Sequence, residues 1–307
     1  MPDISAIVHG LGNIGANVIL SLEAAPDMRC LGVIRGEKSL GTKSRELRGL
    51  PEFSQLGALV EAKGKPDVAI ICGPSRLAPD DALRYLGAGI HTADSFDIHA
   101  EIPALVEKLD VAAVKAKRSA ITAAGLDPGT DSVIRALFLA MVSAGTTFTN
   151  FGRGRSMGHS VAARAVPGVA DAASMTIPMG GGRHSRLVFV LPKPDASSDA
   201  IRSALAADPY FSHDPLEVRF VSSSEELESM LDHSHGVLME RTGASGQTSN
   251  QRLTFDMRIN NPALTAQVLV AAARAATRMP PGCHTLIDIP PVAFLPGDRM
   301  DHIAKLV

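Results

Sequence analysis

Apolar and polar positions along the first part of the chain follow a pattern that is typical of repeated strand–helix units. Short apolar runs indicate buried strands at 5–10, 30–35, 67–72, 90–95 and 119–125. Between them, apolar residues recur with helical spacing at 16–25, 79–89, 102–117 and 132–142. Because the strands are apolar almost throughout, the pattern predicts an α/β fold with a doubly wound parallel sheet of the Rossmann type.

The pattern changes after about residue 145. Strand-like segments now dominate, at 147–154, 173–178, 185–192, 216–223, 235–243 and 252–261, with helical patterns at 160–166, 199–207 and 224–231. This predicts an α+β domain with a mixed sheet. An alanine-rich helical segment at 261–279 is apolar on most faces, so we expect it to be buried. We therefore expect a dinucleotide-binding domain at 1–145, a second domain at 146–260, and a return segment at 261–307 that packs on the first domain.

Composition excludes several classes of partner. Lys and Arg number 30 against 32 Asp and Glu, so the chain lacks the strong positive field of a nucleic-acid or membrane-surface protein. No apolar run approaches the length of about 18 residues that a membrane span needs. The chain enters a strand at once, so we expect no signal peptide, and three scattered cysteines without a CxxC pair predict no disulfide and no metal site. These features fit a reducing cytoplasm.

A glycine fingerprint follows the first predicted strand. Gly10, Gly12 and Gly15, with Asn13 and Ile14 between them, stand between a strand and a helix, which is the context that dinucleotide binding requires. The three glycines allow a tight turn, close approach of a pyrophosphate, and close packing of helix on strand. The helix N-terminus then offers unpaired N–H groups to the phosphates.

The end of the second predicted strand indicates which dinucleotide binds. An NAD site usually carries an acid here, whereas this chain has Arg35 and, nearby, Lys38. Two cations suit a 2′-phosphate and favour NADP, although Glu37 between them weakens the argument. The alternative is a solvated surface loop.

Two acids stand at the carboxyl ends of later strands, where doubly wound sheets bind their ligands. Asp94 ends the strand at 90–95, and Asp127 follows the strand at 119–125 in a Pro-Gly turn. Two carboxylates near a nicotinamide could hold a cationic group such as an amine. Asp127 could instead cap the helix that starts near Asp131. In the second half, Arg186 could bind a carboxylate in bidentate fashion, or could be an exposed residue at a strand start.

Six motifs in order make the chain recognisable. GLGNIG, TADSFDIH, AGLDPGTDS, SMGHS, SMTIP and RINNPALTAQ together resemble meso-diaminopimelate dehydrogenase in its shorter form, over nearly the whole chain. The resemblance implies an NADP-dependent homodimer whose second domain binds substrate and forms the dimer contact. It implies oxidative deamination of the D-centre of meso-2,6-diaminopimelate to L-2-amino-6-oxopimelate and ammonia, which also runs in reverse as reductive amination.

The resemblance also assigns roles to residues. Asp94 and Asp127 are expected to hold the reacting amino group, and either of them could be the base. Further substrate contacts are expected from Phe151, Met157, Gly158, Thr176, Arg186 and Asn261, of which Thr176 and Arg186 hold the distal carboxylate. The nicotinamide and its ribose are expected to lie along Cys72, Gly73, Pro74 and Ser75.

Two positions depart from the family pattern. The family places a tryptophan where this chain has Leu126, and it places a histidine, as a partner of the distal carboxylate, at about Ser249, or at Asn250 if a gap shifts the match. Both changes shorten side chains around the substrate. Two alternatives therefore stay open: the same chemistry on another D-amino acid, and an NADP-binding regulator without catalysis. His91, His99 and His159 lie beside motif residues but lack metal-ligand spacing, and we expect them to be structural.

Overall fold

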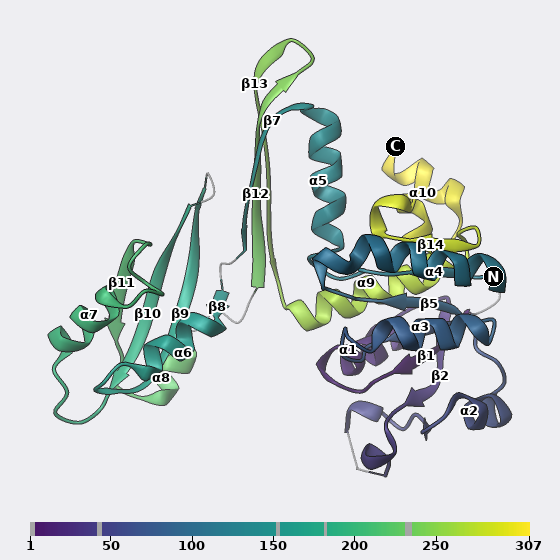
Figure 1. Ribbon diagram of the computed structural model, residues 1–307, viewed down its shortest axis with the longest axis horizontal. Coiled ribbons are helices and arrows are strands. Elements are labelled where there is room, and N and C mark those ends of the chain that lie inside the picture. The colour runs from purple at the N-terminus through teal and green to yellow at the C-terminus, as the bar shows by residue number, and fades with distance from the viewer. Residues whose placement is uncertain (1–3, 42–44, 152–153, 181–182, 231–234) are drawn as a thin grey trace. The chain divides into compact units, whose positions relative to one another are not determined.

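The computed structural model describes residues 4–41, 45–151, 154–180, 183–230 and 235–307. The chain divides into two compact units (Figure 1). Unit 1 comprises Met1–Ala136 and Pro262–Val307, and unit 2 comprises Leu137–Asn261. The sequence pattern placed the corresponding boundaries after residues 145 and 260.

Unit 1 is built on a parallel sheet. Among the described residues this sheet has seven strands, in the order β14-β6-β5-β4-β1-β2-β3. Its strands are β1 (Ile4–His9), β2 (Met28–Ile34), β3 (Glu52–Phe53), β4 (Val68–Ile71), β5 (His91–Asp94), β6 (Ser119–Ile121) and β14 (Gly282–His284). Its helices are α1 (Asn13–Glu23), α2 (Leu56–Lys63), α3 (Ala78–Gly87), α4 (Ile102–Ala116), the first turns of α5 (Thr130–Met141), α9 (Asn261–Ala276) and α10 (Arg299–Leu306). Neighbouring strands pair in parallel, which confirms the predicted fold class.

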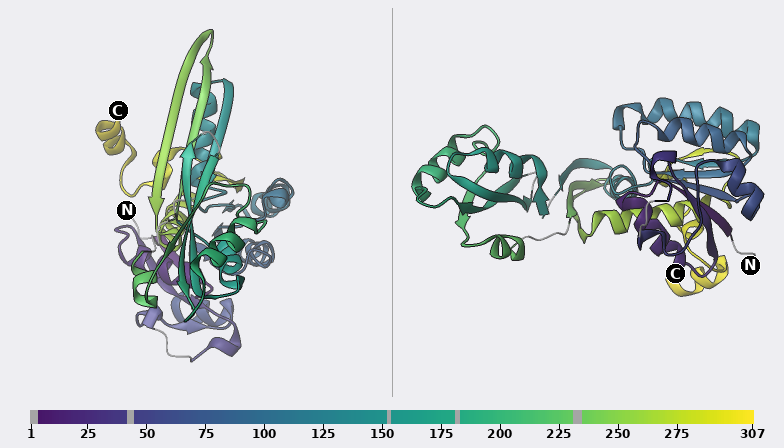
Figure 2. Two further views of the ribbon diagram at one scale, coloured as in Figure 1. Left: turned by 90° about the vertical axis from the view of Figure 1, so that its left-hand side faces the viewer. Right: turned by 90° about the horizontal axis from the view of Figure 1, so that it is seen from below.

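Helices cover both faces of this sheet because its strands are apolar on both sides. In β1, Val8 faces a core formed with α1 and α9, while Ile7 faces a core formed with α3 and α4. The views in Figures 1 and 2 show α3 and α4 on one side of the sheet and α9 on the other. Nine residues of α9 are buried, as its apolar composition predicted.

Unit 2 contains two sheets where the sequence suggested one mixed sheet. The first, ordered β11-β10-β9-β8, is mixed, because β10 pairs with β11 in parallel and with β9 antiparallel. Helices α6 and α7 pack on one face of it and α8 on the other. The second sheet, ordered β13-β12-β7, is antiparallel. The elements are β7 (Ala144–Phe151), β8 (Gly154–Ser156), α6 (Met157–Ala165), β9 (Val169–Gly180), β10 (Arg183–Pro192), α7 (Ser198–Ala207), β11 (Leu216–Phe220), α8 (Ser224–Ser229), β12 (His235–Ser245) and β13 (Thr248–Ile259).

One predicted strand is shorter than its apolar pattern suggested. The strand expected at 119–125 ends at Ile121, because the next residues leave the ladder. Ala123 has φ +57, and the Thr122 hydroxyl and the Ala123 N–H both turn to the carboxylate of Asp94. The residues that do not continue the strand therefore hold the carboxylate of Asp94 instead.

Candidate active site

The glycine loop between β1 and α1 is shaped for a phosphate group. A Cβ on Gly15 would lie 2.1 Å from the carbonyl oxygen of Gly10, so helix and loop can approach this closely only without a side chain. A Cβ on Gly12, in contrast, would meet no protein atom within 4 Å. Gly12 is also the N-cap of α1, and no side chain caps that helix. The start of α1 therefore presents backbone N–H groups next to open space, as the pyrophosphate of a dinucleotide requires.

The end of β2 carries a cation that already has a partner. Nη1 of Arg35 donates to Oε2 of Glu52 on β3 at 2.9 Å, and the guanidinium side chain is mostly buried. Oε1 of Glu52 accepts from the N–H of Gly41 at 2.8 Å. The sequence did not reveal Glu52 as part of this site, because it lies 17 residues from Arg35 and meets it through the pairing of β2 with β3. The side chain of Lys38 lies outside the described residues.

The segment after β4 faces the same loop. The N–H of Cys72 donates to the carbonyl of His9 at 2.7 Å, which fixes the chain beside the glycine loop. Gly73 has open space where a Cβ would be, and Pro74 and Ser75 lead into α3. Burial raises the pKa of the Cys72 thiol, so its sulfur is uncharged at neutral pH.

Asp94 is a buried carboxylate held in one orientation. Its Oδ1 accepts from the N–H of Phe96 at 3.0 Å, the hydroxyl of Thr122 at 2.8 Å and the N–H of Ala123 at 3.4 Å. Burial raises the pKa of Asp94, and the hydrogen bonds only partly offset this. The side chain is 1% exposed, so Asp94 forms the floor of the site rather than its accessible surface.

Asp127 stands in a turn that folds tightly on itself. The N–H of Gly125 donates to the carbonyl of Pro128, and the N–H of Thr130 donates to that of Gly125, both at 3.1 Å. Gly129 has φ +144, and a Cβ there would lie 2.0 Å from the Gly125 oxygen, which explains the glycine. The turn holds Asp127 half-buried, and its Oδ1 accepts from Nη1 of Arg135 at 3.1 Å. A hollow of about 280 Å³, lined in part by Pro128, adjoins this turn.

Asp131 is the site residue that the sequence argument overlooked. It is fully buried, one helical turn after Asp127, and its Oδ2 lies 2.9 Å from Nη2 of Arg135. Burial and the neighbouring Asp127 carboxyl raise the pKa of Asp131 to about 7, while Arg135 opposes the shift. The spacing of Asp127, Asp131 and Arg135 was visible in the sequence, but Asp131 was considered there only as the start of the helix that Asp127 could cap. His99 lies close by, with Nε2 3.9 Å from Oδ2 of Asp127.

In unit 2, Arg186 and Thr176 are brought together on neighbouring strands. Thr176 on β9 pairs opposite Arg186 on β10, and Nη1 of Arg186 donates to the hydroxyl of Thr176. Nε of Arg186 donates to Oδ2 of Asp214 at 2.9 Å, and Nη2 lies 2.7 Å from Nε2 of His184. Arg186 is 8% exposed, so it is not the exposed strand residue of the alternative interpretation. His184 and Asp214 carry no sequence motif, and only the fold connects them to Arg186.

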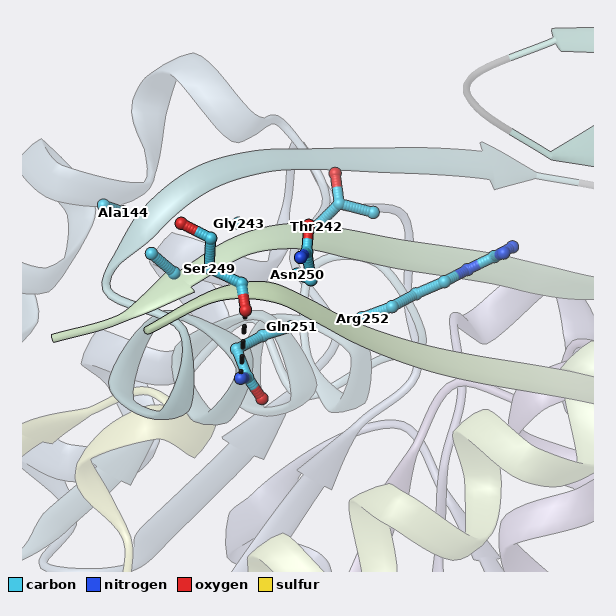
Figure 3. A pocket seen from close by; sticks show the side chains of 8 residues that line it. Ala144, Thr242, Gly243, Ser249, Asn250, Gln251 and Arg252 are labelled. Atoms are coloured by element: carbon cyan, nitrogen blue, oxygen red, sulfur yellow. Dashed lines mark hydrogen bonds between the residues drawn. The ribbon is translucent and has the colours of Figure 1, made fainter. Parts of the chain in front are cut away.

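Ser249 and Asn250 lie elsewhere in unit 2. They stand in the first residues of β13, beside an open hollow of about 560 Å³ that Thr242 and Arg252 also line (Figure 3). The structure gives no hydrogen bond from either described side chain to Thr176 or Arg186. The amide of Gln251 donates to the Ser249 carbonyl at 3.4 Å.

The opposite end of β12 holds the other predicted substrate residues. Val237 pairs with Phe151, His235 pairs with Ile259, and Asn261 follows two residues later. From Val237 to Ser245 this strand runs about 26 Å at roughly 3.3 Å per residue. The side chains of Phe151, Met157 and His235 lie outside the described residues, as does the surrounding of Gly158. The backbone of the Phe151 end continues into β8, where Gly154 pairs with Thr176.

The three histidines beside the motifs have different surroundings. Nδ1 of His91 accepts from the N–H of Ser119 at 3.0 Å, and His159 contacts the rings of Tyr210 and Phe211. Burial lowers the pKa of both imidazoles. His99, in contrast, borders the Asp127 turn. In the part of the chain that the structure describes, no group of His, Cys, Asp and Glu side chains could hold a metal ion, and no helix is long and apolar enough to cross a membrane.

Comparison with known proteins agrees with the resemblance. The Diaminopimelic acid dehydrogenase C-terminal domain matches residues 125–182. The meso-diaminopimelate D-dehydrogenase of Bacteroides fragilis is 43% identical over 307 residues, which cover 100% of both chains. Among solved structures, the C. glutamicum DAP dehydrogenase in complex with DAP has a TM-score of 0.72 at 28% identity and full coverage of both chains. An engineered D-amino acid dehydrogenase bound to NADP⁺ has a TM-score of 0.68 at 26% identity, and the match covers 99% of this chain and 100% of that one.

The 43% identical relative, the matching domain and the solved structures all agree with the motifs that first suggested the family. The chain therefore belongs to the meso-diaminopimelate dehydrogenases.

Proposed function

We propose that the chain catalyses the NADP-dependent oxidative deamination of the D-centre of meso-2,6-diaminopimelate, giving L-2-amino-6-oxopimelate and ammonia, and the reverse reductive amination. The observation that carries this proposal is the 43% identity to the B. fragilis meso-diaminopimelate D-dehydrogenase over the whole of both chains. The C. glutamicum structure with DAP and the neighbour with NADP⁺ support the substrate and the cofactor.

The cofactor would be held by residues of unit 1. The open space at Gly12 and the uncapped start of α1 suit its pyrophosphate, and Arg35 suits a 2′-phosphate. Cys72, Gly73, Pro74 and Ser75 would border the nicotinamide end. When bound, NADP⁺ accepts a hydride from the α-carbon of the substrate.

The two acids would divide the remaining work. At neutral pH the reacting amino group is an ammonium, and one of its protons must leave before nitrogen can form a double bond to the α-carbon. Asp127 is half-buried beside a hollow, whereas Asp94 is 1% exposed. We therefore assign Asp127 as the base that takes the proton and Asp94 as the carboxylate that orients the nitrogen. Water then adds to the imine carbon, and ammonia leaves to give the 2-oxo acid.

The distal end of the substrate would be recognised in unit 2. Arg186 offers the planar donor that a carboxylate needs, and the Thr176 hydroxyl lies beside it. The remaining substrate contacts would come from Phe151, Met157, Gly158 and Asn261. Unit 2 would also form the contact between the two subunits of a homodimer. The enzyme would act in the cytoplasm. Asn250 and Ser249 remain candidates for substrate contact only through their place in the family alignment.

A second substrate class is favoured by one residue. The family tryptophan is replaced by Leu126, which is 6% exposed beside the Asp127 turn. A smaller side chain here would admit a D-amino acid with a bulkier apolar side chain, as the likeness to an engineered D-amino acid dehydrogenase also suggests. The two substrate proposals can be separated by measuring NADPH formation with a panel of D- and L-amino acids that includes meso-diaminopimelate and D-phenylalanine. Preference for meso-diaminopimelate supports the first proposal, and NADPH binding without turnover on any amino acid would support a regulator instead.

A further inference from the structure

Asp127 shares its environment with a second carboxyl group that is removed from water. Asp131 lies in the first turn of helix α5, directly after the turn that carries Asp127, and both carboxyl groups reach the same arginine. Asp131 is 0% exposed. Arg135, one further turn along, places Nη1 3.1 Å from Oδ1 of Asp127 and Nη2 2.9 Å from Oδ2 of Asp131. One guanidinium therefore faces two carboxyl groups.

The charges of this cluster are unequal. With both acids ionised, Arg135 leaves one negative charge uncompensated in a buried place, and neighbouring carboxylates resist ionising together. Both carboxylate oxygens of Asp131 are buried, and neither forms a well-aligned hydrogen bond among the described residues beyond the ion pair of Oδ2 with Arg135. A buried carboxylate that shares its one cation with a second carboxylate is unfavourable, whereas a protonated carboxyl can donate its own hydrogen to Asp127. Among the described residues, His99, with Nε2 3.9 Å from Oδ2 of Asp127, and the backbone N–H of Ser132 also face the cluster.

We propose that Asp131 is a positioning residue that holds a proton against Asp127, and that release of this proton places a second negative charge behind the base and increases its proton affinity. The inference rests on the proposed function, in which Asp127 takes a proton from the substrate amine. At low pH, Asp131 donates to Asp127 and fixes an ionised acceptor in place. At higher pH, the extra charge makes Asp127 a stronger base, so deamination becomes faster.

Asp131→Asn separates these states, because an amide donates to Asp127 at every pH and never gains a charge. Steady-state kcat for deamination of meso-diaminopimelate would be measured with saturating NADP⁺ between pH 5.5 and 9. We expect kcat of the unchanged enzyme to rise by roughly 3- to 10-fold through a limb near pH 7, and this limb to be absent from the variant. The two should agree within about threefold at pH 5.5. A uniform loss at all pH values, or two profiles of the same shape, would overturn the proposal.

Two controls keep the test decisive. Asp171→Asn removes another acid that pairs with an arginine, Arg164 at 2.7 Å, and should leave the pH profile of kcat unchanged.

The infrared C=O stretch of a protonated carboxyl should disappear between pH 5.5 and 8.5 in the unchanged protein and be missing in Asp131→Asn. If no amino acid reduces NADP⁺, the proposed function fails, and the infrared band still decides the proposal: a band that titrates in the unchanged protein and is missing in Asp131→Asn supports the held proton, and no difference between the two proteins overturns it.

Discussion

The proton on Asp131 should be measurable as a change in folding stability, independently of catalysis. In the unfolded chain this carboxyl has a pKa of 3.8, and in the folded chain burial and Asp127 raise it to about 7. Between these values the folded state binds one proton more than the unfolded state, so stability decreases as pH rises. A difference of about three pKa units corresponds to roughly 4 kcal/mol in total, of which about 2.5 kcal/mol falls between pH 5 and pH 8.

Asp131→Asn removes this contribution, because an amide does not titrate. Urea unfolding of both proteins at pH 5, 6, 7 and 8 gives the free energy of unfolding at each pH. The difference, unchanged protein minus variant, should fall by about 2.5 kcal/mol across this range. Titrating groups that do not interact with Asp131 affect both proteins equally and cancel in the difference. Glu217→Gln, at an exposed pair with Arg219, serves as the control and should give a flat difference. A flat difference for Asp131→Asn would refute the reasoning, because Asp131 would then be ionised in the folded state throughout.

Four further outcomes test the site and the fold. Arg35→Ala should weaken NADP⁺ binding tenfold or more and leave NAD⁺ binding almost unchanged, since a bond to a charged group contributes about 1.5–3 kcal/mol; equal losses in a binding titration would contradict the assignment. Asp127→Asn should lower kcat by about 100-fold or more with intact NADP⁺ binding, and full activity would remove Asp127 from the mechanism. Asp214→Asn should raise KM for meso-diaminopimelate but not for D-alanine, which lacks a distal carboxylate, because it releases Arg186; equal changes would point to a structural role. Arg274→Met should destabilise the fold by about 1.5–3 kcal/mol, because the half-buried Asp27 loses its bidentate partner and keeps only the ion pair with Arg278 at 3.8 Å, and a loss below about 0.5 kcal/mol in urea unfolding would contradict this.

The sequence was sufficient for the features that depend on local pattern. The apolar runs predicted the parallel strands, and the glycines between β1 and α1 predicted an open helix start, because both are determined by neighbouring residues. Asp94 and Asp127 became candidates because each lies at or just after the end of an apolar run in the sequence. The family was found because its motifs recur in order.

What the sequence did not reveal depends on pairing between distant segments. Glu52 meets Arg35 only because β3 pairs with β2, and Asp214 meets Arg186 across 28 residues. Asp131 could be seen in the sequence, but its raised pKa follows from its burial. Burial depends on the tertiary structure, which the local sequence does not determine. The comparison of Ser249 with a family histidine depended on counting across the turn between β12 and β13, where loop lengths vary among relatives. In the same sheet, His235 lies near the Phe151 end, far along β12 from Ser249.

The return of α9 to unit 1 has a consequence for the order in which the chain folds during synthesis. One face of the parallel sheet is covered by α1 together with α9, and Arg274 of α9 binds Asp27 at a separation of 247 residues. Residues up to Ala136 therefore emerge from the ribosome with the part of this apolar face that α9 covers still uncovered. The missing helix ends at Ala276, which at about 5–20 residues per second follows roughly 7–30 s later. During that interval unit 2 can fold on contacts of its own, whereas the nascent dinucleotide-binding sheet depends on chaperones or on its own solubility.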